Sequence, residues 1–90
     1  PVYGNDDKYQ PCTEMWHPLL VKMPFNIAIN GHTHMYEYLE PGKQGNKFPV
    51  YVGGGYKEGT GTIIVLKKQG KELSAEIISD KGEILKSVLL

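Results

Sequence analysis

The chain has 90 residues, enough for one small domain that buries about 60 to 70% of the surface of its unfolded chain. Ten lysines balance ten acidic residues and arginine is absent, so the composition lacks the positive charge that a nucleic-acid partner requires. The single cysteine, Cys12, cannot form an internal disulfide, and no apolar run reaches the roughly 18 residues that cross a membrane.

The amino-terminal segment, residues 1–11, is polar, rich in turn-forming residues and without a hydrophobic period, so we predict a loop. A chain that begins inside a loop is expected to continue a longer protein. No targeting signal is evident, and the sequence leaves the cellular location open.

A change of pattern at Thr13 predicts a short amphipathic helix over about residues 14–23. Pro18 lacks a backbone donor, so the helix should start near it or bend there. Apolar residues near helical spacing should cover a sheet; they are Met15, Leu19, Leu20 and Met23.

Three apolar or alternating runs then predict strands on either side of a loop over residues 30–34. These runs are residues 25–29, 35–39 and 48–52. Three further strands should form a hairpin-connected meander over about residues 61–90, because Gly70 and Gly82 mark the turns between them. Those strands are residues 62–67, 73–79 and 84–89.

These elements predict an α+β fold that is mostly β, within a single domain over residues 1–90. One short helix would accompany about five or six strands, placed mainly in one mixed or antiparallel sheet.

Two of the three histidines lie in the loop after the first predicted strand, as His32 and His34. In extended backbone, residues two apart point to the same side about 6 to 7 Å from each other. That spacing suits two metal ions about 3.5 to 4 Å apart better than one ion. Gly31 would allow an unusual backbone dihedral or a close approach by other groups. A His-x-His pair is a weak signal alone, and an exposed polar turn is the plain alternative.

Three stretches in order strengthen the metal interpretation. The string FNIAINGHTHMYEY over residues 25–38 resembles the last motif of the calcineurin-like metallophosphoesterase family, in which a strand runs into Gly-His-x-His. WHPLLVK over residues 16–22 resembles the short helix before that motif, and PVYVGGG over residues 49–55 resembles the strand and glycine turn after it. The likeness covers residues 16–55, and the later strands are consistent with it.

The resemblance implies a dinuclear centre of manganese, iron or zinc that hydrolyses phosphoesters. His32 would bind one metal and His34 the other, with backbone support from Gly31. It also implies that the chain is the carboxyl-terminal part of an α/β/β/α sandwich, in which Tyr36 and Gly54 could lie on the substrate side.

The departures from the family pattern are equally specific. The motifs that supply its other ligands, an Asp-x-His, a Gly-Asp-x-x-Asp, a Gly-Asn-His and a single histidine, have no counterpart here. Asn5, Asp6 and Asp7 are interpreted as solvated loop residues. We therefore assign no catalytic residue to this chain, and expect it to be inactive and metal-free alone, with the missing amino-terminal half of the domain as its partner.

Other candidate residues have plainer interpretations. His17 is expected to be structural, and Cys12 to be an inert small residue, since no cationic cluster lowers its pKa. Packing is favoured over a substrate groove for Tyr36 and Tyr38. Residues 53–55 are favoured as a plain turn over a backbone site for phosphate.

Removing half of a domain would expose strand edges and apolar surface, so we predict a homo-oligomer, most simply a dimer. Two other function classes stay open: a self-contained β-rich binding or structural domain with an incidental His-x-His, and a small hydrolase completed by ligands from a second subunit. The sequence does not identify the phosphoester, because loops select monoesters, diesters or nucleotides.

Overall fold

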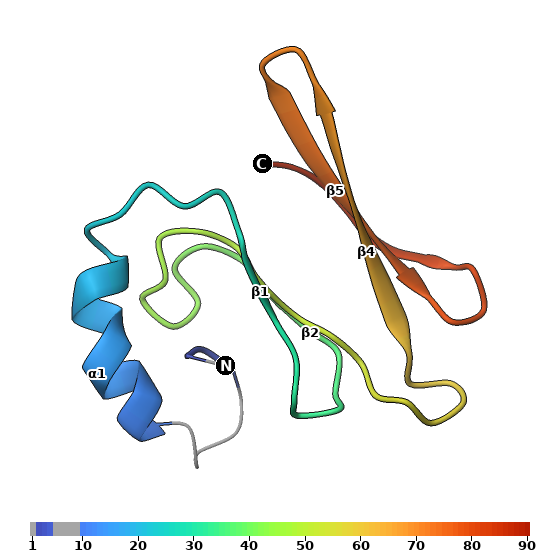
Figure 1. Cartoon of the computed structure of the whole chain (residues 1–90), viewed down its shortest axis with the longest axis horizontal. Coiled ribbons are helices and arrows are strands. Elements are labelled where there is room, and N and C mark those ends of the chain that lie inside the picture. The colour runs from blue at the N-terminus through green and yellow to red at the C-terminus, as the bar shows by residue number, and fades with distance from the viewer. Residues whose placement is uncertain (1, 5–9) are drawn as a thin grey trace.

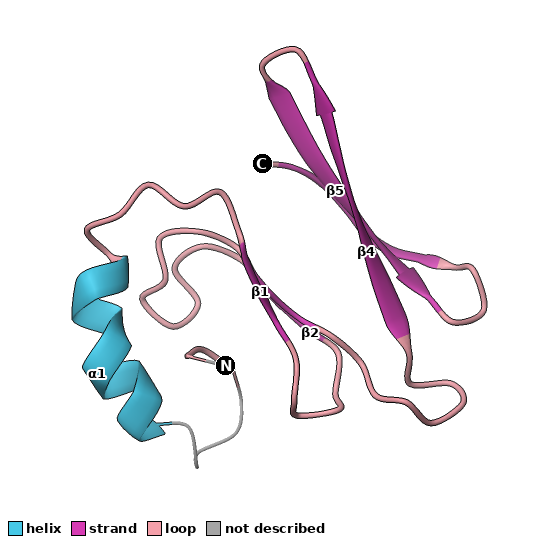
Figure 2. Cartoon of the chain, in the orientation of Figure 1, coloured by secondary structure: helices cyan, strands magenta, loops and turns pink. Residues whose placement is uncertain are grey.

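The computed structural model describes residues 2–4 and 10–90. Within these residues there are one helix and two three-stranded sheets, and the first sheet lies between the helix and the second sheet in a flat molecule with extents of 36 × 36 × 16 Å (Figures 1 and 2). The predicted α+β, mostly β class is confirmed. The strands do not lie mainly in one sheet, as predicted, but divide equally between two. No helix among the described residues is long and apolar enough to span a membrane.

Helix α1 spans Gln10–Leu20, so it starts about one turn earlier than predicted. Pro11 explains the early start, since proline is well suited to the first turn, where its missing N–H leaves no bond unmade. Thr13 consequently lies inside the helix, where its hydroxyl donates to the Val2 carbonyl oxygen instead of capping. The last turn tightens, because Lys22 N–H donates to the Leu19 carbonyl at 3.2 Å, and Pro24 prevents continuation.

The helix covers less of the sheet than predicted. Leu20 packs against the core, but Met15, Leu19 and Met23 remain 69%, 50% and 52% exposed. Most of the apolar residues predicted to cover the sheet therefore face solvent in the single chain, and Met23 lies beyond the end of α1.

The first sheet has the order β1-β3-β2, with β1 at Ala28–Asn30, β2 at Glu37–Leu39 and β3 at Val50–Val52. β1 runs parallel to β3, and β2 runs antiparallel to it. The strands are shorter than predicted. At the start of β3, Pro49 has no N–H with which to extend the ladder before Val50. β3 is fully buried and forms the centre of the sheet.

The core lies on the helix side of β3. Tyr3, Phe48, Val50 and Val52 form a buried cluster, against which Leu20, Ala28 and Leu39 pack, among others. Aromatic rings meet edge to face there, with Tyr3 and Phe48 centroids 6.2 Å apart. The opposite face of β3 presents Tyr51, whose ring lies 6.2 Å from that of Tyr36.

The second sheet is the predicted meander. β4 spans Thr62–Gln69, β5 spans Glu72–Ser79 and β6 spans Ile84–Leu89, all antiparallel in that order. Gly70 and Gly82 occupy the connecting turns with φ of 61° and 84°, as the turn signals require.

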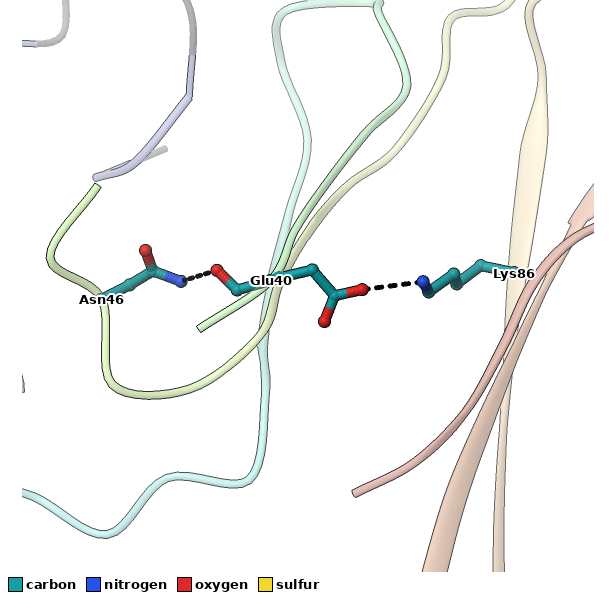
Figure 3. A network of polar contacts seen from close by, with 3 residues as sticks. All are labelled: Glu40, Asn46 and Lys86. Carbon is teal, nitrogen blue, oxygen red and sulfur yellow. Dashed lines mark hydrogen bonds and ion pairs between the residues drawn. The ribbon is translucent and has the colours of Figure 1, made fainter. Parts of the chain in front are cut away.

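Polar contacts join the two sheets. Glu40, which follows β2, accepts a hydrogen bond from Lys86 Nζ of β6 at 2.7 Å, while its backbone carbonyl accepts one from Asn46 Nδ2 at 3.1 Å (Figure 3). The Lys86 ammonium also lies 5.0 Å from the centroid of the Tyr38 ring. Nearby, the Tyr51 hydroxyl bonds to Thr62 Oγ1 at 2.7 Å.

Alkaline pH is expected to destabilise the protein. Burial raises the pKa values of Tyr3, Tyr36 and Tyr38 above their ordinary value of 10.0. Below pH 10 these phenols are protonated in both states, so stability is unaffected. Above it the unfolded chain releases protons that the folded chain keeps, so the free energy of unfolding falls until the folded-state phenols ionise. Thermal unfolding followed from pH 8 to pH 11 measures this loss.

Tyr38→Phe supplies the control, because it removes one of the three shifted phenols and should make the alkaline loss shallower. An unchanged slope, together with absorbance titration showing all tyrosines ionising as in the unfolded chain, would contradict the prediction.

Candidate functional site

The loop after β1 holds both histidines in an unusual backbone conformation. His32 and His34 are exposed and adopt φ of 88° and 63°, in the left-handed region that side chains with a Cβ rarely enter. The loop is therefore bent, and the spacing expected from extended backbone does not apply. The φ of Gly31 is not left-handed, and a Cβ added there would meet no described atom within 4 Å, so backbone support of the metal site by Gly31 stays a prediction.

The glycine run after β3 supports this bend. Gly53 N–H donates to the Asn30 carbonyl at 2.8 Å, which joins the ends of the parallel strands β1 and β3. A Cβ on Gly55 would lie 3.0 Å from the Cβ and carbonyl oxygen of His34. The ring of Tyr56 meets the His34 ring edge to face at 5.3 Å. His34 is thus held by direct contact with the segment that follows β3.

The backbone amides of residues 53–55 donate hydrogen bonds to other parts of the protein. Besides the bond from Gly53, Gly54 N–H donates to Thr62 Oγ1 at 2.8 Å and Gly55 N–H donates to the Thr60 carbonyl at 3.1 Å. A Cβ on Gly54 would overlap the Thr60 carbonyl oxygen, so the glycine permits a close approach of two backbones. These contacts support the turn interpretation, and a substrate-side role for Gly54 stays a prediction.

An open cavity of about 500 Å³, lined by both polar and apolar side chains, lies beside His34, between the first sheet and the β5–β6 turn. Tyr36 lines it, which keeps the substrate-side prediction for this residue open, although its ring also packs on Tyr51 as expected. Asp80 is fixed at its rim by a bond from Gly59 N–H at 2.5 Å. Its other polar side chains are Thr60, Thr62, Ser79, Lys81 and Glu83.

Sequence reasoning missed these cavity residues. The sequence pattern at Asp80, Lys81 and Glu83 is typical of a hairpin turn. Only the packing of the second sheet against the first places these residues near His34. No local signal in the sequence could have identified them.

The donors fit a metal in type but not in number. Imidazole nitrogens suit zinc, manganese and iron. Among residues 2–4 and 10–90, no group of three or more His, Cys, Asp or Glu side chains is arranged to hold an ion. The prediction for Asn5, Asp6 and Asp7 falls outside the residues that the structure describes.

The remaining histidine has a structural role, as predicted. His17 Nδ1 lies 2.7 Å from the Tyr3 hydroxyl, and the two rings pack edge to face at 5.7 Å. Cys12 is exposed.

Comparison with known proteins adds no assignment: no protein-family model, curated protein or solved structure matches the chain.

Proposed function

We propose that His32 and His34 are ligands in a two-metal phosphoester hydrolase centre whose other ligands come from outside these 90 residues. The observation that carries this proposal is the pair of exposed imidazoles in left-handed backbone at the carboxyl end of β1. Residues other than glycine that adopt a left-handed backbone conformation cost free energy, and they are concentrated at functional sites. The carboxyl ends of parallel strands are also where open sheets commonly bind ligands.

The neighbouring geometry supports the same proposal. β1 and β3 run parallel, so the loop with His32 and His34 and the glycine run over residues 53–55 both follow the carboxyl ends of neighbouring strands. The cavity beside His34 has the size of a small-molecule site, and its hydroxyl and charged groups suit a polar substrate portion. Bound metals would polarise the phosphoryl group and activate water. The role of His32 and His34 is to donate ring nitrogens that fix the position of those ions.

The ligand count limits what the isolated chain can do. A two-metal site needs about four ligands for each ion, and this chain offers the two imidazoles. We therefore propose that the chain alone is catalytically inactive and holds metal weakly at most.

Zinc titration followed by NMR is expected to perturb the ring resonances of His32 and His34 together, at roughly millimolar metal. His17 is the internal control, because its Nδ1 already bonds to the Tyr3 hydroxyl. The matched variants are His32→Asn and His34→Asn, since asparagine accepts left-handed backbone but removes the imidazole. Each variant should abolish the joint response while leaving the far-ultraviolet spectrum unchanged. A response at His17 alone, or none at His32 and His34, would contradict the metal role.

Hydrolysis of an aryl phosphate provides the second test. With manganese, zinc or iron added, the isolated chain should show no turnover above a buffer control. Turnover that disappears in His32→Ala would disprove the claim of inactivity while supporting the claim of a metal site.

One observation favours a structural alternative. The His34 ring packs against the Tyr56 ring, which is a sufficient role for an imidazole in a β-rich binding or structural domain. That alternative predicts that His34→Asn lowers stability and that zinc leaves both rings unperturbed.

A further inference from the structure

The outer edge of β1 is unpaired among the described residues. β1 lies at one end of the first sheet, with β3 on its inner side. Ala28 N–H donates to the Pro49 carbonyl, and the Asn30 carbonyl accepts from Gly53 N–H, so both residues direct their backbone groups toward β3. Because these directions alternate along a strand, Ile29 directs its N–H and C=O toward the open edge.

This edge carries none of the charges that protect exposed strands. Residues 24–30 read PFNIAIN and include no charged side chain. The other edge strands do carry them: β2 has Glu37, β4 has Lys67 and Lys68, and β6 has Lys86. Natural proteins place such charges, lysine especially, on edges that stay in solvent. The contrast indicates that the β1 edge is normally covered.

Apolar side chains surround the same edge. Ile29 is 50% exposed and Phe25 is 45% exposed. An apolar hollow of about 270 Å³ adjoins β1, lined in part by Val2, Tyr3, Leu20, Ile27 and Phe48. A partner at this edge would therefore bury side chains as well as backbone.

The surface area of the chain indicates how large the missing contact is. The accessible surface is 6155 Å² for a mass of 10.1 kDa, whereas a folded monomer of that mass exposes about 5,300 Å². The excess of roughly 900 Å² is close to the 800 Å² or so that each partner contributes to a stable dimer.

We propose that a second copy of this chain pairs with the β1 edge. A two-fold axis would set the two β1 strands antiparallel and join the three strands of each first sheet into one continuous sheet. Ile29 and Phe25 of each copy would pack across the axis. The zero net charge of the chain removes any overall repulsion between copies. The proposed pairing rests on the backbone and side chains of residues 25–29 and uses neither His32 nor His34.

Light scattering after size-exclusion chromatography tests the proposal directly. The chain should elute as a dimer at micromolar concentration. Ile29→Lys should weaken the dimer by about 100-fold or more, since it places a charge at the centre of the interface on both copies. Ile63→Lys is the matched control: Ile63 is 61% exposed on β4 of the second sheet, and its variant should remain dimeric.

Two further readouts keep the test decisive. Circular dichroism must show that both variants retain native strand content, and hydrogen exchange should show protection of the Ile29 amide that is lost on dilution or in Ile29→Lys. A monomer at 100 µM overturns the proposal, as does a dimer that Ile63→Lys dissociates and Ile29→Lys does not.

Discussion

Gly54→Ala is expected to lower the free energy of unfolding by about 3 kcal/mol or more. The reason is the overlap of a Cβ at this position with the Thr60 carbonyl oxygen, which belongs to backbone and cannot rotate away. Relief requires the two segments to separate, and this breaks the bonds from Gly54 N–H to Thr62 and from Gly55 N–H to Thr60. Because His34 rests on Gly55, the cavity should widen as well. Chemical denaturation measures the loss of stability.

Gly31→Ala is the matched control for this variant. It adds the same methyl group in the neighbouring loop, but the added Cβ meets nothing within 4 Å and the backbone is not left-handed. We expect its effect to stay within about 0.5 kcal/mol. Equal stability of the two variants would show that the close approach at Gly54 is not structurally important.

Asn46→Ala is expected to destabilise the protein by about 2 to 4 kcal/mol. The Asn46 side chain is buried at 1% exposure and makes three hydrogen bonds to backbone. It donates to the carbonyls of Glu40 and Phe48 at 3.1 and 2.8 Å, and accepts from Gln44 N–H at 3.0 Å. Alanine removes all three bonds; the Glu40 carbonyl keeps the bond from Lys43 N–H, but the Phe48 carbonyl loses its bond from Asn46 next to the core, since Phe48 belongs to the buried cluster.

Asn26→Ala tests whether the loss of stability depends on the burial of the Asn46 side chain. Asn26 is exposed, and its substitution should change the free energy of unfolding by no more than about 0.5 kcal/mol. In Asn46→Ala we also expect Glu40 to become more mobile, which NMR relaxation can follow at the Lys86 ammonium that it contacts. If Asn46→Ala and Asn26→Ala have equal effects, the loop between β2 and β3 does not depend on the buried amide.

The second sheet was predictable because the residues that determine its strands and turns are close together in the sequence. Alternating side chains over β4 to β6, with glycine in each turn, determine both the strands and their antiparallel order. The helix boundary was wrong because Pro11, interpreted as part of a loop, instead occupies the first turn. The division into two sheets was missed because it depends on pairing between segments far apart in sequence, such as β1 with β3.

Only part of the candidate site could be predicted from the sequence. His32 and His34 could be located from a short motif, but their left-handed backbone could not, and neither could the contacts of His34 with Gly55 and Tyr56, which are about twenty residues away in the sequence. The three charged residues of the β5–β6 turn have no local signature of a site. Their role at the cavity exists only once the two sheets are placed side by side.

The polar junction between the sheets also affects how the protein would respond to a ligand. His34 and Tyr36 reach the cavity from the first sheet, whereas Asp80 and Glu83 reach it from the second. A molecule bound between them would contact two sheets that are also joined by bonds such as Lys86 to Glu40 and Tyr51 to Thr62. Binding would then slow the local opening of both sheets together, because either opening would first have to release the ligand. Ligand binding in the cavity would therefore make the two sheets unfold more cooperatively.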